Sequence, residues 1–369
     1  MDEGEDEAAA PVEPDAPRRR WPRLPHVGRE VRATLTVVVL IFVFEYILLP
    51  EIARARKSVH LLGQVNVYGL VFAVLLEIGA LVAYAELTHT VLSPGAPGRG
   101  RLFRINMSSL AVSHVLPGGT AAGTALSYRL FGEAGVPSSV SAFGLAIQGA
   151  GSALVLNALF WVALLVSIPM YGYNQRYGIA AVAGFLLIAA FTGVVLILTK
   201  GKQSAADRVH RIAGHLPFVN ADRVAGLVAS VGDRLDLVRS DHGLLRRGLV
   251  WAAANWCLDA ASLWVFLLAF GHLVSPVDLL VAYGLANILA FIPVTPSGLG
   301  VVEGVLIATL VGFHVPRDTA VLGVLTWRLV NFWLPIPVGG AAYLSLRISE
   351  RRLRELGEAQ PAQEGPLVG

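Results

Sequence analysis

The chain has 369 residues, of which 55% are hydrophobic and only 15% are charged. Because a water-soluble domain carries about 25% charged residues, this composition excludes an ordinary soluble protein and favours one that is solvated by the lipid bilayer. The net charge of +3 arises from basic residues in short runs beside apolar segments, a pattern of membrane topology that argues against a nucleic-acid partner.

Polar segments lie at both ends of the chain. The first begins with an acidic run rich in Pro and Ala and continues into the arginines at 18–20. A cleavable signal peptide has the opposite order, because it starts basic and then turns apolar. We predict a disordered cytoplasmic tail over residues 1–31, a membrane domain over 32–348 and a polar cytoplasmic tail over 349–369.

Apolar stretches fill the region between the tails. A spanning helix needs about 20 mostly apolar residues, and six stretches meet this requirement: roughly 32–49, 66–92, 138–168, 178–199, 248–271 and 318–346. Two further apolar stretches, 105–131 and 276–315, are interrupted in the middle by Pro and Gly. The sequence therefore predicts an all-α polytopic membrane protein with six spanning helices and two broken segments.

Lysine and arginine collect in four segments: the N-terminal tail, the 93–104 loop, the 200–247 segment and the C-terminal tail. Cytoplasmic loops retain positive charge, so we expect these segments, including both termini, on the cytoplasmic side of the inner membrane. The basic residues in 50–65 are an exception. Residues 203–247 also have an amphipathic pattern, which predicts a segment lying on the cytoplasmic interface, with a small soluble helical hairpin as the alternative.

The two broken segments fit this topology only if each enters the membrane and returns to the side from which it came. Each is then a re-entrant hairpin. Non-helical backbone at that depth is tolerated only where it is buried in protein or lines a wet cavity, because lipid cannot satisfy its N–H and C=O groups. The breaks therefore mark an interior site.

The two hairpins correspond when the sequence is shifted by 179 residues. This shift places Pro117 on Pro296 and Gly119 on Gly298, and it also aligns the Val-Pro pairs that follow. Three predicted spans lie between the two prolines, so the second copy is inverted. Inverted repeats with broken helices are the architecture of secondary transporters, in which the two halves move to alternate access.

Small residues at both breaks suit an anion site. Half-helices that start there leave backbone N–H groups free, and together with the helix dipole these groups bind a phosphate. The residues concerned are Gly118, Gly119, Thr120, Ser297, Gly298 and Gly300. The alternative is that Gly119-x-x-x-Gly123 and Gly300-x-x-x-Gly304 are small-residue packing motifs, and the two interpretations are compatible.

Ionisable side chains inside the spans are costly and are therefore functional candidates. Counting ~1.5 Å per residue from the span ends places Glu77, Asp259 and Arg328 about 15 Å deep, near the midplane. Glu303 lies in the first turn after the second break. We expect a polar interior in which Arg328 pairs either with a lipid phosphate or, as a structural ion pair, with Glu303 or Asp259.

Two asparagines accompany these charges. Asn255 shares a helical face with Asp259, and Asn331 shares one with Arg328, because each pair is separated by three or four residues. We expect both asparagines to line the same polar interior.

Patterns for bond-making chemistry are missing from the sequence. We find no nucleophile–base pair, no zinc-binding spacing and no phosphate-binding Gly-Lys loop. The single cysteine, Cys257, lies in an apolar stretch and has no intrachain disulfide partner. We therefore expect no catalytic residues, no metal and no cofactor.

Three motifs carry a resemblance to a known family: LPGGTAAGTALSYRLF at 116–131, FIPVTPSGLGVVEG at 291–304 and TWRLVNFWLP at 326–335. They resemble the flippase-like membrane region of lysylphosphatidylglycerol synthases, over about residues 33–348. The resemblance implies translocation of a lipid between leaflets, in the best-known relatives an aminoacylated phosphatidylglycerol. By motif position it implies a role for Pro117, Gly118, Gly119, Arg129, Pro296, Gly298, Gly300, Glu303 and Arg328.

We therefore expect an integral membrane flippase, not an enzyme, whose partners are membrane lipids. The alternative is a non-transporting accessory protein that presents a lipid to an enzyme of envelope or glycolipid synthesis. Full-length relatives carry out lysyl transfer with a soluble aminoacyl-transfer domain that follows the membrane region. This chain has a polar tail at that place, so we expect lysyl transfer to be absent. The sequence indicates no oligomeric state.

Overall fold

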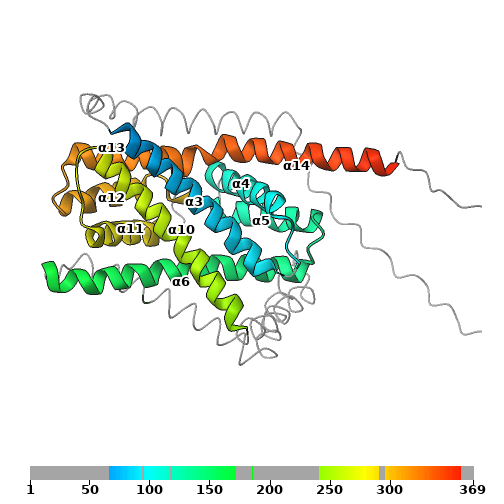
Figure 1. Cartoon of the computed structure of the whole chain (residues 1–369), viewed down its shortest axis with the longest axis horizontal. Coiled ribbons are helices and arrows are strands. Elements are labelled where there is room, and N and C mark those ends of the chain that lie inside the picture. Colours follow the sequence, from blue (N-terminus) through cyan, green and yellow to red (C-terminus); the bar gives the residue numbers. More distant parts are fainter. Residues whose placement is uncertain are drawn as a thin grey trace, which may run out of the picture. The chain divides into compact units, whose positions relative to one another are not determined.

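The computed structural model describes residues 66–93, 95–116, 119–171, 185, 241–290 and 296–358. Every regular element within these ranges is a helix (Figure 1). In chain order the elements are α3 (Val67–Leu92), α4 (Arg99–Val115), α5 (Gly119–Glu133), α6 (Ser138–Tyr171), α10 (His242–Ala269), α11 (Pro276–Ala290), the 3₁₀ turn η3 (Pro296–Gly298), α12 (Val301–Gly312), α13 (Arg317–Arg328), the π-helix η4 (Leu329–Trp333) and α14 (Pro335–Glu358).

Four helical segments in the described part are long and apolar enough to cross a membrane: Val67–Leu92, Ser138–Ser167, His242–Ala269 and Arg317–Ser349. They correspond to four of the spans that the sequence predicts, and the described part is all-α, as expected. The predicted span 32–49 lies outside the described residues, and so does 178–199 apart from residue 185.

Two boundaries differ from those expected. α10 begins at His242, where the side chain of Asp241 accepts a hydrogen bond from the N–H of Leu244 and caps the helix. The end of the predicted interfacial segment 203–247 therefore belongs to α10, and its remainder up to residue 240 lies outside the described residues, as does the predicted tail 1–31. At the other end α14 continues to Glu358, so the start of the predicted polar tail is helical.

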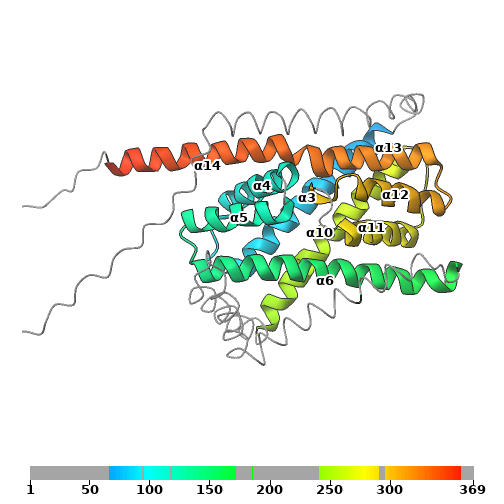
Figure 2. The same ribbon diagram turned by 180° about the vertical axis from the view of Figure 1, so that it is seen from behind.

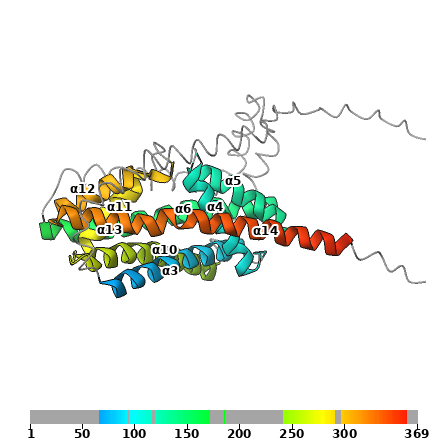
Figure 3. The same ribbon diagram turned by 90° about the horizontal axis from the view of Figure 1, so that it is seen from above.

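Helices α3 and α10 run side by side in opposite directions (Figures 1 and 3). The N–H of Asn66, which caps the start of α3, bonds to the carbonyl of Ala269 at the end of α10 (3.3 Å). Farther along, the hydroxyl of Ser262 donates to the carbonyl of Ala73 (2.9 Å). A β-carbon at Gly69 would lie 3.1 Å from the β-carbon of Ala269. Small residues thus allow the close approach that membrane helices use in place of hydrophobic burial.

Each broken segment consists of two helices that pack against each other, α4 with α5 and α11 with α12. The two breaks also contact one another. The hydroxyl of Ser297 in η3 donates to the carbonyl of Ser113 at the end of α4 (2.8 Å), and a β-carbon at Gly119 would lie 3.1 Å from the nitrogen of Ser297. The non-helical backbone of the two segments therefore meets at one place.

The two hairpins also turn at corresponding residues. Gly119 and Gly298, which are separated by 179 positions, have positive φ values of 44° and 70°. Gly135 and His314 have the same separation and φ values of 85° and 66°. His314 is a non-glycine residue in a conformation that side chains disfavour, so the turn geometry is kept where the residue type is not.

The helix after each hairpin packs in the same way. A β-carbon at Gly144 in α6 would lie 2.6 Å from Cδ2 of Leu92 in α3, and one at Gly323 in α13 would lie 2.5 Å from Cδ2 of Leu267 in α10. Gly144 and Gly323 are again 179 positions apart. At both positions glycine accommodates a leucine from the long helix of its own half.

The main apolar core lies where the second hairpin meets α6 and α10. Figure 2 shows α6 running along α11, and Gly284 of α11 faces Phe160 of α6, whose β-carbon would be 2.8 Å from a β-carbon at 284. Tyr283 and Trp327 are fully buried in this cluster. Their polar atoms therefore need partners inside the protein, and these partners define the candidate site.

Candidate functional site

A π-helical turn places the central polar residues. Helix α13 ends at Arg328, and in the turn that follows the N–H of Leu334 bonds to the carbonyl of Leu329, five residues earlier (2.9 Å). Pro335 has no N–H to offer the carbonyl of Asn331, so the regular α-helical pattern is interrupted here. Such turns change the direction of neighbouring side chains and are frequent at functional sites.

Arg328 and Glu303 form a buried ion pair. Oε1 of Glu303 accepts a hydrogen bond from Nε of Arg328 (2.5 Å), and Oε2 accepts one from the N–H of Gly300 (2.6 Å). Both residues are less than 10% exposed. The carboxylate thus caps the first turn of α12, where the helix dipole also favours negative charge. Of the two acids considered as partners for Arg328, the structure selects Glu303.

The guanidinium of Arg328 retains an unused donor. Its carbon lies 4.8 Å from the ring centroid of Phe332 and 5.6 Å from that of Trp327, within cation–π range. The Phe332 ring also stacks on His114 from α4, with ring centroids 4.2 Å apart. Nη2 of Arg328 is buried and has no hydrogen-bond partner among the described residues. A buried, unpaired cationic donor is rare and requires an explanation.

Two carboxyl groups accept hydrogen bonds from residues close to Arg328 in the chain. Asp259 accepts hydrogen bonds from the hydroxyl of Tyr283 (2.6 Å), from Nε1 of Trp327 (2.7 Å) and from Nδ2 of Asn331 (3.2 Å). Oε1 of Glu77 accepts a bond from the same Nδ2 of Asn331 (2.9 Å). Its other oxygen, Oε2, is buried without a partner in the described part of the chain. The π-helical turn therefore connects α3 and α10 through one amide group.

Residues 30–339 match the protein family described as the lysylphosphatidylglycerol synthase TM region. The chain belongs to this family. The resemblance seen in its three motifs is thereby confirmed. A UPF0104 membrane protein of Methanothermobacter thermautotrophicus is 21% identical over 70% of this chain and 80% of its own length, and a second one from that organism is 21% identical over 84% and 93%. The Escherichia coli inner membrane protein YbhN is 23% identical over 64% and 67%.

The backbone groups predicted to bind an anion are not all free. The N–H of Gly119 donates to the carbonyl of Leu116 (3.0 Å), and the N–H of Gly300 donates to Glu303. The prediction of free donors is therefore wrong at these two positions. At the second break the anion is the protein's own carboxylate, since a glutamate three residues into a helix reaches back to the N-cap.

The alternative interpretation, small-residue packing, holds at one break only. A β-carbon at Gly123 would lie 2.5 Å from the carbonyl oxygen of Ser109 in α4, so glycine is required for α5 to approach α4. A β-carbon at Gly304 would have no atom within 4 Å. Gly300-x-x-x-Gly304 is thus not a packing motif within the described structure.

The remaining predicted residues are distributed as follows. Pro117 and Gly118 lie outside the described residues, and Pro296 opens the η3 turn. Thr120 is exposed. Arg129 lies near the far end of α5, where it pairs with Glu133 and its side chain is 56% exposed. Asn255 joins α10 to α3 by donating to the carbonyl of Ala80 (3.0 Å), so its amide does not bond to the carboxyl pair as that of Asn331 does. Asn331 donates to Glu77 and Asp259 and lies in the polar interior, as expected.

Sequence reasoning missed four residues of the site: Tyr283, Trp327, His114 and Phe332. All four are aromatic or imidazole side chains in apolar surroundings, which is the usual pattern of a packed core. Trp327 and Phe332 flank the basic and polar residues of TWRLVNFWLP, and that proximity was the one available signal. Nothing in the sequence brings Tyr283 to Asp259.

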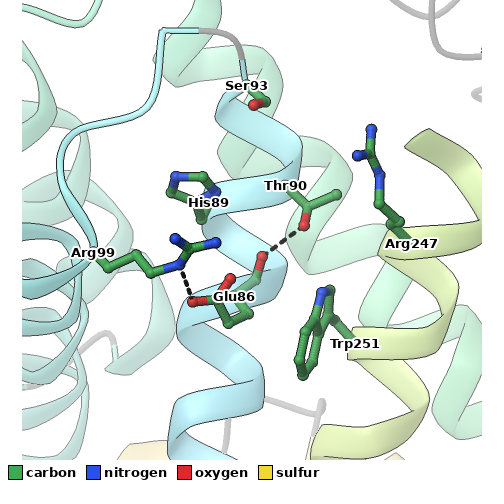
Figure 4. A pocket seen from close by; sticks show the side chains of 7 residues that line it. All are labelled: Glu86, His89, Thr90, Ser93, Arg99, Arg247 and Trp251. Carbon is green, nitrogen blue, oxygen red and sulfur yellow. Dashed lines mark hydrogen bonds and ion pairs between the residues drawn. The ribbon is translucent and has the colours of Figure 1, made fainter. Parts of the chain in front are cut away.

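A small polar pocket lies where α3 ends beside the start of α10, away from the carboxyl pair (Figure 4). Its volume is about 200 Å³. In Figure 4 the side chain of Arg99 reaches across to Glu86, with which it forms an ion pair (2.7 Å). The pocket is lined by Glu86, His89, Thr90, Ser93, Arg99, Arg247 and Trp251. Two arginines and one glutamate give it a positive balance at the side of the membrane that the sequence predicts to be cytoplasmic.

Proposed function

We propose that this chain is a lipid flippase: it moves a phospholipid or related amphiphilic lipid between leaflets by alternating access and catalyses no bond-making reaction. The observation that carries the proposal is the contact between the two breaks beside a buried arginine with an unused donor. An anionic head group supplies the acceptor that Arg328 Nη2 lacks, while the acyl chains stay in the bilayer.

An inverted repeat provides the mechanical basis. The shift of 179 residues relates the first hairpin to the second and also relates α3 to α10, because Val67–Leu92 shifts onto 246–271. α3 and α10 run antiparallel, as two copies of opposite orientation require. We propose that the hairpins are re-entrant, that they enter from opposite faces, and that the two halves exchange conformations as in other secondary transporters.

The chemistry around Arg328 supports an anionic ligand. Arginine binds phosphate and carboxylate through parallel N–H donors, and here Nε is taken by Glu303 while Nη2 is open. A low-dielectric interior strengthens such a contact. The family description names a synthase of a phosphatidylglycerol derivative, which supports a lipid phosphate as the acceptor. We further propose an inner-membrane location, on the strength of the YbhN name, with both termini cytoplasmic.

Lipid translocation in proteoliposomes tests the proposal. Purified protein is reconstituted with a fluorescent phosphatidylglycerol, and the fraction of probe that a membrane-impermeant quencher reaches is followed over time. We expect wild-type protein to make the inner-leaflet probe accessible and Arg328→Ala to lose this activity. Arg351→Ala is the matched control, because Arg351 is an exposed arginine on α14, and it should keep the wild-type rate.

Glu303→Gln gives a second, finer comparison. Glutamine keeps the acceptor for the N–H of Gly300 and removes the charge that Arg328 now pairs with. We expect tighter retention of an anionic lipid and slower release. Equal translocation rates in wild type, Glu303→Gln and Arg328→Ala would exclude these side chains from the transport path and would leave a non-transporting accessory role.

A further inference from the structure

We propose that Glu77 and Asp259 form a proton-binding site in which the two carboxyl groups together bind one proton, and that this site couples lipid movement to a proton gradient. The proton site stands on the geometry of α3, α10 and η4. Its coupling to lipid rests on the proposed function.

The hydrogen bonds assign the proton to Glu77. Asp259 accepts from three donors, the side chains of Tyr283, Trp327 and Asn331, which is the environment of an ionised carboxylate. Glu77 accepts from Asn331, while the neighbouring hydroxyl of Ser262 donates to the carbonyl of Ala73. Glu77 is 2% exposed. Its Oε2 atom is buried and has no partner among the described residues. An ionised carboxylate with so few donors is too costly to bury, whereas a neutral carboxylic acid is not.

Like charge strengthens the assignment. Glu77 and Asp259 share one amide nitrogen, and two neighbouring carboxylates in a low-dielectric site do not both ionise. The groups around the carboxyl pair come from several elements. Asn331 and Ser262 lie against Glu77. The titratable or charged groups against Asp259 are Tyr283 from α11 and Arg328 from α13, and the neutral ones are Trp327 and Asn331.

Arg328 does not neutralise the second carboxylate. Its Nε atom is bound to Glu303, so the arginine and that glutamate balance each other, and Asp259 supplies the one negative charge that the cluster carries with Glu77 neutral. Loss of the proton would raise the buried charge to two carboxylates without a cation. The proton is therefore part of the resting structure.

The donors around the carboxyl pair favour a proton over a metal cation. A sodium or calcium ion needs oxygen ligands with free lone pairs. The pair is instead surrounded by an indole N–H, a phenol O–H and an amide N–H₂, which point their positive ends at the carboxylates. A bare cation would have to displace these donors, while a proton leaves them in place.

Position links this proton to the lipid site. Trp327, which donates to Asp259, directly precedes Arg328, and Asn331 lies one turn later in η4. An anion that binds Arg328 adds negative charge beside the carboxyl pair, so it binds best when Glu77 is protonated. Proton and anionic head group therefore favour each other, which is the linkage that a symporter requires.

Infrared spectroscopy tests the proton site without any lipid assay. A buried carboxylic acid has a C=O stretch distinct from that of a carboxylate. We expect detergent-solubilised wild-type protein to show this band at neutral pH and Glu77→Gln to lose it. Asp318→Asn, which removes an exposed carboxyl from the start of α13, should keep the band. A band that is absent from the wild type, or that persists in Glu77→Gln, would overturn the assignment.

Transport with and without a pH gradient tests the coupling. Glutamine mimics the neutral acid, so Glu77→Gln should still equilibrate fluorescent phosphatidylglycerol between leaflets when no gradient is present. We expect it to lose the acceleration that an imposed pH gradient gives the wild type, and an imposed sodium gradient should accelerate neither protein. A gradient response in Glu77→Gln equal to that of the wild type would contradict the coupling. Wild-type protein that moves no lipid would refute the proposed function alone, because the infrared band still decides whether the proton site exists.

Discussion

The two broken hairpins have similar backbone conformations at their turns but differ in the charge of their side chains. Both turn at glycines with positive φ, Gly119 and Gly298, and both are followed by a helix whose glycine receives a leucine. The first hairpin carries His114 and hydroxyl side chains beside its break, whereas the second carries Glu303, which caps α12 and holds Arg328. The two hairpins thus turn in a similar way, and the ion pair lies at the second break.

The helices that follow the hairpins show the same division. Gln148 in α6 donates to the hydroxyl of Thr88 in α3 (2.7 Å), and Trp327 in α13, which is 179 positions later, donates to the carboxylate of Asp259 in α10 (2.7 Å). Equivalent positions therefore supply the donor in both halves. The acceptor is a neutral hydroxyl in the first half and an acid in the second. The acceptors do not correspond in position, because Thr88 shifts onto Leu267 and Asp259 shifts back onto Ala80. The 179-residue shift therefore relates the donors, while the position and the charge of the acceptor differ.

The largest expected effect on stability comes from Glu303, the charged residue that corresponds to Thr124 in the first hairpin. Glu303→Ala leaves the guanidinium of Arg328 buried without its ion-pair partner, and we expect the free energy of unfolding to fall by about 3–5 kcal/mol. Thr124→Ala is the equivalent change in the first hairpin. Thr124 is exposed, and its hydroxyl donates to the carbonyl of Thr120 in its own helix, so its loss should cost less than about 0.5 kcal/mol.

Reversible unfolding in mixed detergent micelles measures this pair of variants. The double variant Glu303→Ala with Arg328→Met should recover part of the loss, because it removes the unpaired charge. Similar losses for Glu303→Ala and Thr124→Ala would show that the ion pair contributes nothing to the second hairpin beyond its backbone.

The glycines of the breaks come next. Gly298→Ala forces a side chain into positive φ and would place its β-carbon 2.7 Å from that of Ala290, so we expect a loss of about 2–4 kcal/mol. Gly300 has a positive φ of 82°, similar to the 70° of Gly298, but a β-carbon there meets nothing within 4 Å. Gly300→Ala therefore measures the cost of the backbone conformation alone, which we expect to be about 1–2 kcal/mol. Thermal unfolding of both variants provides the test, and a Gly300→Ala loss as large as that of Gly298→Ala would contradict the close packing at η3.

The hydrogen bond between the two hairpins contributes less to stability. Ser297→Ala removes the hydrogen bond to the carbonyl of Ser113, which should lower stability by about 1 kcal/mol. We also expect faster hydrogen exchange at the break residues of both hairpins. Faster exchange in the second hairpin alone would mean that the two breaks do not support each other.

The smallest effect is expected at Arg129. The family resemblance implies a role for this residue, yet its side chain is 56% exposed and pairs with Glu133 on the surface. Exposed ion pairs contribute about 0–1 kcal/mol, so Arg129→Gln should change stability little and leave translocation at the wild-type rate. A loss of translocation comparable to that of Arg328→Ala would place this end of α5 in the lipid path.

Apolar stretches and helix-breaking residues were sufficient to predict most of the described helices. The candidate site could not be predicted in the same way, because it depends on contacts between residues far apart in the sequence. The spans at 66–92 and 138–168 follow from continuous hydrophobicity, and the breaks follow from Pro and Gly, because these signals act within one turn of helix. Hydrophobicity predicts a continuous α-helix over 318–346, whereas the structure has a π-helix at Leu329–Trp333. The amide of Asn331 in this turn bonds to acids on α3 and α10, and such contacts between distant segments leave no local signal in the sequence. The occupied N–H of Gly300 was predictable, because the Gly300-x-x-Glu303 spacing is a capping signal.

A disulfide between the two breaks tests the central claim that they form one moving lipid path. A β-carbon at position 119 lies 3.5 Å from Oγ of Ser297, close enough for cysteines at both positions to bridge. In a Cys257→Ser background, oxidised Gly119→Cys with Ser297→Cys should stop phosphatidylglycerol translocation, and reduction should restore it, whereas each single variant should be insensitive to oxidation. Full translocation with the disulfide formed would contradict the account.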